Sequence, residues 1–279
     1  KLAGAVAYGD YKKTINDSSI LKIALEYTKT FGGRVISFCQ DEFLSQNGVI
    51  NESIVSTELG LKGIPDISES INIYRDIQIL GYTNGKLHIP YVNTKRGVEL
   101  IRDAKKRNLD ITASTSLAHL IFSDKDINEF NTNLKLNPPL RSEIDCKSVK
   151  EGLIDGTIDY LTSMHEPLDL DNKKVVFDLA TPGSIGLESV FGNMCNNFTL
   201  EKTIDILTRN KSIFQIEDHP IEKGSYADLT LFNPDKSYEF SNEHILSTSK
   251  NCAYLGTKLK GIVYGSINNN NSTLNSSWT

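Results

Sequence analysis

The sequence predicts an α/β fold built on parallel strands, and two observations support this prediction. Between residues 4 and 164, short apolar segments alternate with amphipathic segments whose apolar residues recur at helical spacing. The apolar segments end in small or polar residues, as expected where the C-terminal end of a buried parallel strand opens into a site. Because this alternation requires crossovers between strands, we expect a parallel sheet.

Five strands and four helices are expected in this first part of the chain. The strands are expected over residues 4–8, 34–39, 86–92, 109–115 and 157–164. The helices are expected over residues 18–32, 68–83, 94–108 and 142–156. The segment 94–108 is clearly amphipathic, with its apolar residues on one face of the expected helix.

After residue 198 the pattern changes, and we expect a small β-domain. Residues 199–216 look helical, and residues 222–240 indicate two short strands around an Asn-Pro-Asp turn. A last strand is expected over 259–267. We divide the chain into a first part (1–210), a β-domain segment (211–267) and a polar tail (268–279). We expect the tail to be disordered or an extended arm unless something holds it.

Composition excludes several classes of protein. The net charge of -5 argues against nucleic acid as a partner, because that would need a basic face. We see no apolar stretch near the length of a membrane span, and the first residues do not form a signal peptide. Cys39, Cys146, Cys195 and Cys252 form no metal-binding pair, so we expect free thiols in a cytoplasmic protein.

Three segments resemble the dihydroorotases of the amidohydrolase superfamily. They are RVISFCQD, TNLKLNPPLRSEIDCKSVKEGLIDGTIDYLTSMHEP and EKGSYADLTLFNPD. The resemblance runs from Ala5 to about Ile267. It implies a (β/α)8 barrel of TIM type with zinc at the C-terminal ends of its strands, and a small β appendage. Five strands cannot close such a barrel, so residues 1–210 would supply strands four to eight as a partial barrel.

The resemblance also implies where zinc ligands should be, and this sequence has other residues there. The bridging acid or modified lysine of the family falls on Tyr11, and the fifth-strand and sixth-strand histidines fall on Phe38 and Tyr91. The eighth-strand aspartate, which also transfers protons, falls on Met164. A first-strand His-x-His pair would lie upstream of Lys1. Because zinc needs nitrogen, sulfur or carboxylate donors, we expect no metal, no other cofactor and no catalytic acid.

Neighbouring side chains offer little replacement for these ligands. The candidates are Asp10, Cys39, His88 and His165, each an odd number of residues from one of the four positions. On a strand, an odd offset directs a side chain to the opposite face. We therefore expect these four side chains to point away from the barrel axis.

Three residues are candidates for binding a substrate or another small ligand. Asn137 resembles the family's substrate-contacting asparagine, and Arg141 lies in the same segment. They either retain an anion pocket or are kept because the double proline between them shapes a loop. His165 is expected to make a structural hydrogen bond or to contact a ligand. For His119 we expect a structural role.

The leading functional hypothesis is a catalytically inactive dihydroorotase homologue of pyrimidine biosynthesis. The resemblance implies a structural or regulatory role, either as a homo-oligomer or as a partner of aspartate carbamoyltransferase. The first alternative is an active zinc-dependent dihydroorotase, which interconverts carbamoyl aspartate and dihydroorotate, with unusual ligands. The second alternative is a small-molecule sensor built around Asn137 and Arg141.

Overall fold

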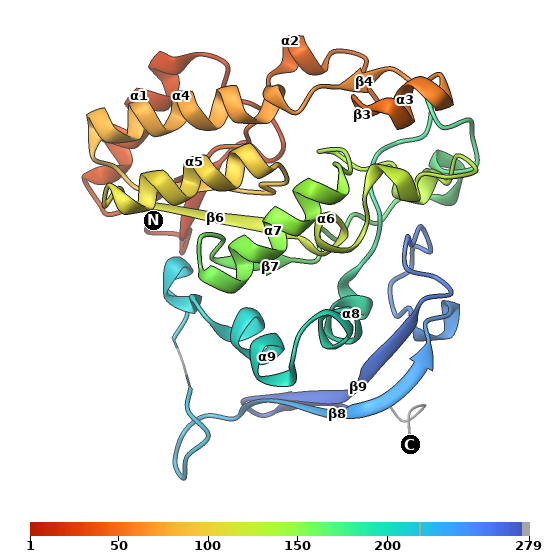
Figure 1. The fold of residues 1–279 in the computed structure, drawn as a ribbon. Helices are drawn as coiled ribbons and strands as arrows, with labels where there is room; N and C mark the ends of the chain where they lie inside the picture. Colours follow the sequence, from red (N-terminus) through yellow and green to blue (C-terminus); the bar gives the residue numbers. More distant parts are fainter. Residues whose placement is uncertain (218, 275–279) are drawn as a thin grey trace.

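A five-stranded parallel sheet forms the centre of the N-terminal part (Figure 1). The structure is a computed structural model that describes residues 1–217 and 219–274. The strands of this sheet are β1 (Ala7–Gly9), β2 (Arg34–Ile36), β5 (Leu87–Ile89), β6 (Ile111–Ser116) and β7 (Tyr160–Thr162). All neighbouring pairs are parallel. The α/β prediction is therefore confirmed, and each strand lies within or close to its expected range.

The order of the strands identifies the sheet as part of a barrel wall. It runs β1-β2-β5-β6-β7, so the strands of this sheet pair in the order in which they occur along the chain, while β3 and β4 form a separate pair. An open doubly wound sheet would instead reverse its strand order at a switch point. Among the described residues the sheet ends at β1 and β7 without closing. It is therefore an arc of a barrel, as the resemblance implies.

Four helices cover the outside of this sheet, and all four were expected. They are α1 (Ser18–Lys29), α4 (Ile67–Thr83), α5 (Lys95–Lys106) and α7 (Glu143–Asp155). Neighbours in the series α1, α4, α5 and α7 pack side by side (Figure 1). Side-chain caps fix where they begin: the Thr94 hydroxyl accepts from the Gly97 N–H, and Ser142 forms a capping box with Asp145.

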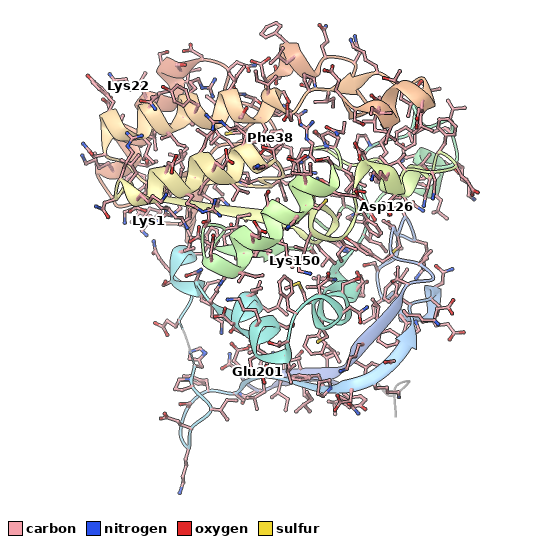
Figure 2. The ribbon with its side chains drawn as sticks, viewed as in Figure 1. Lys1, Lys22, Phe38, Asp126, Lys150 and Glu201 are labelled. Carbon is pink, nitrogen blue, oxygen red and sulfur yellow. The ribbon has the colours of Figure 1, made fainter. Side chains whose placement is uncertain are left out.

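The core lies between the helices and the sheet. Leu21 and Leu25 of α1 and Ile73 and Ile77 of α4 are buried there. Every residue of β6 is buried, as expected for a central parallel strand covered on both faces. Phe38, labelled in Figure 2, is also buried. All four cysteines are free, as expected.

Several short elements were not expected from the sequence. They are α2 (Glu42–Ser45), β3 (Ile50–Asn51), α3 (Ile54–Leu59), β4 (Gly63–Ile64), α6 (Leu117–Ile121) and α8 (Val190–Asn197). Single 3-10 turns occur at Asp124–Asp126, Thr132–Leu134, Leu170–Asn172, Leu187–Ser189, Lys211–Phe214 and Asn242–His244. Each of these spans eight residues or fewer, below the window of about 11–18 residues over which a periodic pattern is recognised, so periodicity could not reveal them.

The C-terminal part differs from the prediction in two places. Its sheet has the antiparallel order β10-β9-β8, with β8 at Asp228–Glu239, β9 at Lys258–Asn268 and β10 at Asn271–Leu274. The expected Asn-Pro-Asp turn is instead an irregularity within β8, because β9 pairs with residues on both sides of it. The first part of the expected polar tail, up to Leu274, is held in the sheet, because β10 pairs with the end of β9. Residues 275–279 of the expected tail lie outside the described residues.

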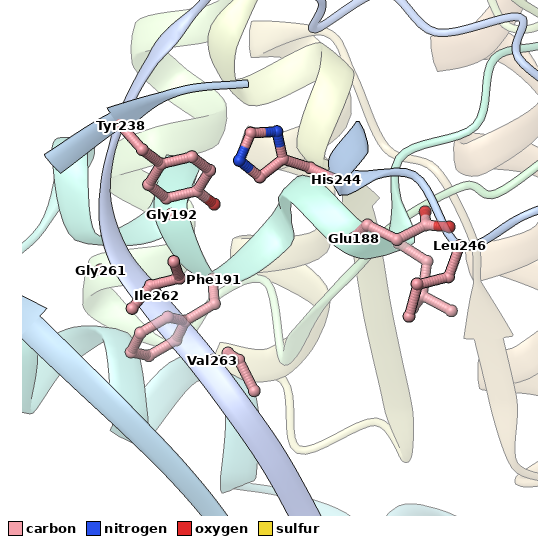
Figure 3. Close-up of a pocket in the computed structure, with 10 residues that line it drawn as sticks. Glu188, Phe191, Gly192, Tyr238, His244, Leu246, Gly261, Ile262 and Val263 are labelled. Atoms are coloured by element: carbon pink, nitrogen blue, oxygen red, sulfur yellow. The ribbon is translucent and has the colours of Figure 1, made fainter. Parts of the chain in front are cut away.

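A helix joins this sheet to the rest of the molecule. Helix α8 packs on β9, and α9 (Leu200–Thr208) follows it. Between α8 and the sheet lies a cavity of about 220 Å³ lined in part by Phe191, Tyr238 and Val263 (Figure 3). Gly261 has φ +95°, and a Cβ there would come within 2.9 Å of the Phe191 ring. No helix among the described residues is long and apolar enough to cross a membrane.

Candidate functional site

The C-terminal ends of the parallel strands surround a cavity of about 170 Å³, which we call the mouth cavity. All five strands, or the turns after them, contribute to its lining: Asp10, Tyr11, Lys12, Ile36, Phe38, His88, Pro90, Tyr91, Ser114, Tyr160 and Thr162. Three of the four positions where the resemblance places metal ligands, Tyr11, Phe38 and Tyr91, therefore meet in one cavity. Segments far apart in the sequence converge there because parallel strands share a C-terminal edge.

An ion pair spans this mouth from one edge of the sheet to the other. Lys12 follows β1, Glu166 follows β7, and these strands are the two edges of the sheet. The Lys12 Nζ lies 2.5 Å from Glu166 Oε1, and their side chains are only 10% and 17% exposed. The Tyr11 hydroxyl donates to the same carboxylate oxygen at 2.8 Å. We refer to Lys12 and Glu166 as the mouth ion pair.

Two tyrosine rings flank the Lys12 ammonium. Its Nζ lies 5.2 Å from the centroid of the Tyr91 ring and 5.8 Å from that of Tyr11, within reach of cation–π attraction. Burial lowers the pKa of Lys12 from its usual 10.5, and the charge of Glu166 acts in the opposite direction. Burial and the hydrogen bond to Glu166 raise the pKa of Tyr11, and burial also raises the pKa of Tyr91. Both phenols are therefore neutral at physiological pH.

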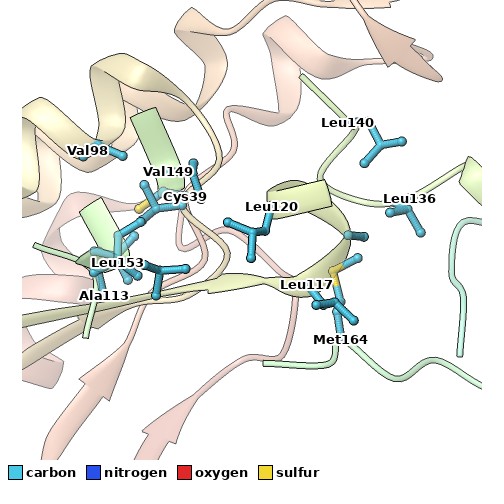
Figure 4. Close-up of a cluster of buried hydrophobic side chains, with 14 of the residues drawn as sticks. Cys39, Val98, Ala113, Leu117, Leu120, Leu136, Leu140, Val149, Leu153 and Met164 are labelled. Atoms are coloured by element: carbon cyan, nitrogen blue, oxygen red, sulfur yellow. The ribbon is translucent and has the colours of Figure 1, made fainter. Parts of the chain in front are cut away.

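Met164 occupies a different environment from the other three positions. It is buried in the apolar core and does not line the mouth cavity. Figure 4 shows it beside Leu117 of the core. Met164 has φ +46° and Tyr91 has φ +57°, so the backbone is left-handed at both positions. Such a conformation is uncommon for large side chains and marks sharp turns beyond the strand ends.

The expectation that His88 points away from the barrel axis is wrong. His88 lines the mouth cavity together with Tyr91. The parity argument fails because Tyr91 lies beyond the end of β5 in a left-handed turn, where side chains no longer alternate. Asp10 likewise lines the cavity beside Tyr11, since both follow β1. Cys39 does point elsewhere, with its thiol 3.4 Å from Asp76 of α4.

His88 is held neutral by burial, and both of its ring nitrogens have hydrogen-bond partners. Its Nδ1 lies 2.9 Å from Thr112 Oγ1, and its Nε2 lies 3.1 Å from Ser114 Oγ and 2.8 Å from the Tyr160 hydroxyl. The imidazole also stacks on the Tyr160 ring. Burial, with a smaller contribution from the charge of Arg34, lowers the pKa of His88 to about 3. Both ring nitrogens therefore already have partners in β6 and β7.

His165 joins three segments of the chain. Its Nδ1 accepts from the backbone N–H groups of Gly186 and Leu187 at 3.3 and 3.2 Å. Its Nε2 must then carry the proton, and it donates to Ser247 Oγ at 3.2 Å. The Ser247 hydroxyl donates in turn to Glu188 at 2.6 Å. Because this hydroxyl donates to the acid and not to the histidine, the arrangement does not activate Ser247 as a nucleophile.

Asn137 and Arg141 do not share a pocket in the described structure. Asn137 is half-buried and lines a groove of about 200 Å³ that also includes Gln40 and Lys135. Arg141 is 1% exposed, and its Nη1 donates to Asn51 Oδ1 at 2.9 Å and to the Ile64 carbonyl at 2.6 Å. Arg141 thus ties the loop to the β3–β4 pair, while Asn137 faces the groove.

His119 supports the same loop from the other side. It is buried, and its Nε2 lies 3.0 Å from the carbonyl of Pro138. Its Nδ1 lies 2.7 Å from Ser116 Oγ. Burial lowers the pKa of His119 to about 4, so the ring is neutral at physiological pH. This arrangement agrees with the structural role that we expected for His119.

Comparison with known proteins identifies the family. The chain is 42% identical to a dihydroorotase of Endomicrobium trichonymphae over 269 residues, which is 94% of this chain and 64% of that protein. It is 39% identical to a dihydroorotase of Acetivibrio thermocellus over 278 residues, 97% of this chain and 65% of that protein. The chain belongs to the dihydroorotase family. It spans about two thirds of the length of these relatives. No family model matches the chain.

Solved structures agree on the fold. A D-hydantoinase aligns with a TM-score of 0.81 at 20% identity, over 97% of this chain and 64% of that one. The L-hydantoinase of Arthrobacter aurescens aligns with a TM-score of 0.82 at 18% identity, over 98% and 65%. At this level of identity the likeness concerns the fold alone. It places the five-stranded sheet in the TIM-barrel fold of these hydantoinases.

The residues present do not fit the zinc that the dihydroorotase family implies. Phe38 has no donor atom, and Met164 lies in the core instead of the mouth cavity. Tyr11 already donates its hydroxyl to Glu166. No group of three or more His, Cys, Asp or Glu side chains that could hold a metal occurs within residues 1–217 and 219–274. A catalytic zinc site needs at least three such donors, together with a water.

Sequence reasoning missed Lys12 and Glu166 as members of the site. Lys12 adjoins Tyr11, and Glu166 follows Met164 and His165, so both were close to positions that we had singled out. The sequence signals this ion pair only by a lysine near one strand end and an acid near another. Predicting that the two side chains meet requires knowledge of the order of the strands in the sheet.

Proposed function

We propose that the chain is part of a dihydroorotase homologue of pyrimidine biosynthesis that has lost zinc-dependent catalysis and acts as a structural or regulatory partner. Membership of the family supports the link to pyrimidine biosynthesis. The loss of catalysis is our inference from the mouth cavity. In this proposal the barrel keeps its fold, and the strand ends hold an ion pair and aromatic rings instead of metal ligands.

The observation that supports this proposal most strongly is the position of Lys12. Its ammonium lies among side chains from the ends of β1 and β5 and is paired with Glu166 after β7. A positive charge at this place repels a divalent cation, and the repulsion is strong where water is partly excluded. Without a metal, no activated hydroxide and no Lewis acid is available for attack on a cyclic amide.

Zinc content and activity test the loss of catalysis. We expect elemental analysis of the protein, in its natural full length, to find no stoichiometric zinc that resists mild chelation. We also expect neither cyclisation of carbamoyl aspartate nor ring opening of dihydroorotate above background. The dihydroorotase of Acetivibrio thermocellus, prepared in parallel, is the positive control. A zinc-dependent rate would refute this part of the proposal.

The partner role needs a separate experiment. The proposed partner is the aspartate carbamoyltransferase of the same organism, and the alternative is a homo-oligomer. Light scattering of the protein alone and mixed with that enzyme distinguishes the two, because a specific complex should bury more than about 1,000 Å² and persist at micromolar concentration. A strict monomer in both samples would remove the support for a partner role.

One observation favours an active enzyme as the second candidate. Asp10 and His88 line the mouth cavity, so two potential donors are closer to the barrel axis than expected. Both nitrogens of His88 are, however, already within hydrogen-bond distance of side chains on β6 and β7. If this candidate is correct, His88→Ala should abolish a zinc-dependent rate while the protein remains folded.

A further inference from the structure

Lys12 brings a primary amine to the wall of the mouth cavity. It follows β1 closely, and its side chain is 10% exposed, so the amine has little contact with bulk water. A lysine that has lost its water is a better nucleophile than one on the surface, because the unprotonated amine is the form that attacks a carbonyl carbon. In the proposed function only the charge of Lys12 matters, which leaves its amine without a chemical role.

Glu166 is placed to take a proton from this amine and to return it. Its Oε1 lies 2.5 Å from Lys12 Nζ, within reach of direct proton transfer. The Tyr11 hydroxyl donates to the same oxygen at 2.8 Å, and the Glu166 N–H donates to the Ser184 carbonyl at 2.9 Å. Both bonds fix the position of Glu166. The carboxylate is therefore held beside the amine and can carry its protons.

The surroundings of the Lys12 ammonium also suit an iminium ion. An iminium formed on Nζ carries the same single positive charge at the same atom. The Tyr91 and Tyr11 ring centroids lie 5.2 and 5.8 Å from Nζ, within reach of cation–π attraction, and the Glu166 carboxylate balances the charge. The site that stabilises the ammonium therefore stabilises the iminium as well, and the conversion brings no new charge into the cavity.

The remaining walls of the mouth cavity indicate the class of carbonyl compound. Ile36, Phe38 and Pro90 give the cavity apolar walls, and its volume of about 170 Å³ admits only a small molecule. Asp10 also lines the cavity, and Glu166 lies beside Lys12. A ligand that carries a carboxylate would meet these two acidic side chains, and like charges repel. An uncharged aldehyde or ketone fits these surroundings better.

We propose that Lys12 forms a reversible imine with a small uncharged aldehyde or ketone in the mouth cavity, and that Glu166 carries the protons of this step. Imine formation needs neither zinc nor a partner protein. The inference therefore goes beyond the proposed function, and measurements of zinc content and of association test that function separately.

The step balances without an added oxidant or reductant. The Lys12 ammonium gives a proton to Glu166, and the nitrogen lone pair bonds to the carbonyl carbon while the C=O π electrons move to oxygen. Glu166 returns its proton to that oxygen and takes another from the nitrogen, which gives a carbinolamine. Glu166 then protonates the hydroxyl group, the C–O bond breaks, and the nitrogen lone pair completes the C=N bond. The products are a protonated imine, water and the Glu166 carboxylate, and water reverses the sequence.

Reductive trapping in the full-length protein tests this proposal. Butanal is the probe, cyanoborohydride reduces the imine to a stable secondary amine, and peptide mass spectrometry locates the butyl group. We expect Lys12 to be labelled at least about tenfold faster than Lys106 near pH 7, because water-exposed lysines generally hold their protons there. Lys106 is a suitable reference, since its side chain is 70% exposed.

A second probe tests the class of carbonyl compound. The aldehyde 4-oxobutanoate has the same chain length as butanal and ends in a carboxylate. We expect the ratio of labelling at Lys12 to labelling at Lys106 to be at least about fivefold lower with 4-oxobutanoate than with butanal, because of the acidic side chains at the cavity. An equal ratio for the two probes would refute the preference for an uncharged compound.

Variants test the two named residues. Lys12→Arg keeps a positive charge beside Glu166 but lacks the amine, so the fast phase of labelling should disappear while labelling of Lys106 is unchanged. Glu166→Gln should slow labelling of Lys12 at least about tenfold, because the proton carrier is lost. The matched control is Glu143→Gln, since Glu143 pairs with Lys125 at the surface with its side chain 65% exposed. This control should change the rate less than about twofold.

Two results would overturn the inference. One is labelling of Lys12 by butanal that is no faster than labelling of Lys106. The other is fast labelling of Lys12 that Glu166→Gln and Glu143→Gln leave equally unchanged, which would refute the role of Glu166. If circular dichroism shows that Glu166→Gln does not fold, Glu166→Asp decides the question, because it keeps the charge and withdraws the carboxylate from the amine by one methylene group.

Discussion

Lys12 and Glu166 show how one pair of side chains joins distant segments. Their side chains are 10% and 17% exposed, so each charge has lost most of its water and depends on the other. We predict that Lys12→Met lowers the free energy of unfolding by about 1–3 kcal/mol, because Glu166 keeps its charge without a cationic partner. Urea denaturation of the wild-type protein and the variant measures this loss.

A surface pair provides the control for this prediction. Lys106 and Asp103 also form an ion pair, with side chains 70% and 72% exposed. Lys106→Met should change the free energy of unfolding by less than about 0.5 kcal/mol, since exposed pairs contribute little. Equal effects of Lys12→Met and Lys106→Met would show that the mouth ion pair is as weak as a surface pair. A double variant with Glu166→Gln measures the coupling between the two residues directly.

Phe38 allows a second prediction at the scale of the residue. It is 5% exposed and lines the mouth cavity beside Ile36 and Pro90. We predict that Phe38→His lowers the free energy of unfolding by about 1–3 kcal/mol, because the imidazole enters apolar surroundings. Phe43→His is the control, since Phe43 is 82% exposed and should tolerate the change within about 0.5 kcal/mol. An unchanged or higher stability of Phe38→His would contradict the apolar description of this site.

At the scale of the element, His88 of β5 connects the strand to β6 and β7 through Thr112, Ser114 and Tyr160. Its folded pKa of about 3 lies below the ordinary value of 6.5, so the unfolded chain binds the proton more readily. The stability due to His88 is therefore complete above pH 6.5 and is lost as pH falls towards 3. His119, with a folded pKa of about 4, acts in the same direction.

Two buried acids, Glu69 and Asp76, oppose the two histidines, because burial raises the pKa of each. Burial raises the pKa of Glu69 from 4.5 to about 7, so its contribution to stability increases as pH falls from 7 to 4.5. We predict that wild-type stability falls between pH 6.5 and 4.5 with a net slope of at most about one proton, or about 1.4 kcal/mol per pH unit. In His88→Gln this slope should decrease by about one proton, so that it vanishes or changes sign. Urea denaturation at several pH values is the measurement, and parallel profiles for the two proteins would contradict the prediction.

The elements that the sequence predicted well are those with a repeating pattern. The helix expected over 94–108 became α5 at Lys95–Lys106, and the helix expected over 68–83 became α4 at Ile67–Thr83. The two-residue strands β3 and β4 are too short to show a period. Strand pairing differs from two local expectations. β9 pairs with β8 on both sides of the Asn-Pro-Asp segment that was expected to be a turn, and it pairs with the polar tail up to Leu274.

At the scale of the whole molecule, the sequence predicted which strand ends meet but not what fills the space between them. Tyr11, Phe38 and Tyr91 converge as expected from parallel strands in barrel order. It could not be predicted that His88 shares the cavity with Tyr91 and that Met164 does not line it, because Tyr91 and Met164 lie in left-handed turns beyond the strands. The pairing of Lys12 with Glu166 depends on the curvature of the sheet, which brings its two edge strands within reach of each other.

The same geometry predicts what restoring the family's ligands would achieve. A variant with Tyr11→Asp, Phe38→His and Tyr91→His places three donors around the mouth cavity. We expect this variant to bind zinc little better than the wild-type protein, because the Lys12 ammonium lies about 5 Å from the ring of Tyr91 and repels the ion. Adding Lys12→Ala should increase the affinity at least about tenfold, a change of about 1.4 kcal/mol. Adding Met164→Asp instead should have no such effect, because residue 164 lies in the core and does not line the cavity.

Zinc titration against a competing chromophoric chelator measures zinc binding by the wild-type protein and the three variants, with circular dichroism to confirm that each is folded. Tight binding by the first variant would show that Lys12 does not exclude the metal. A gain from Met164→Asp equal to that from Lys12→Ala would show that residue 164 reaches the mouth after all.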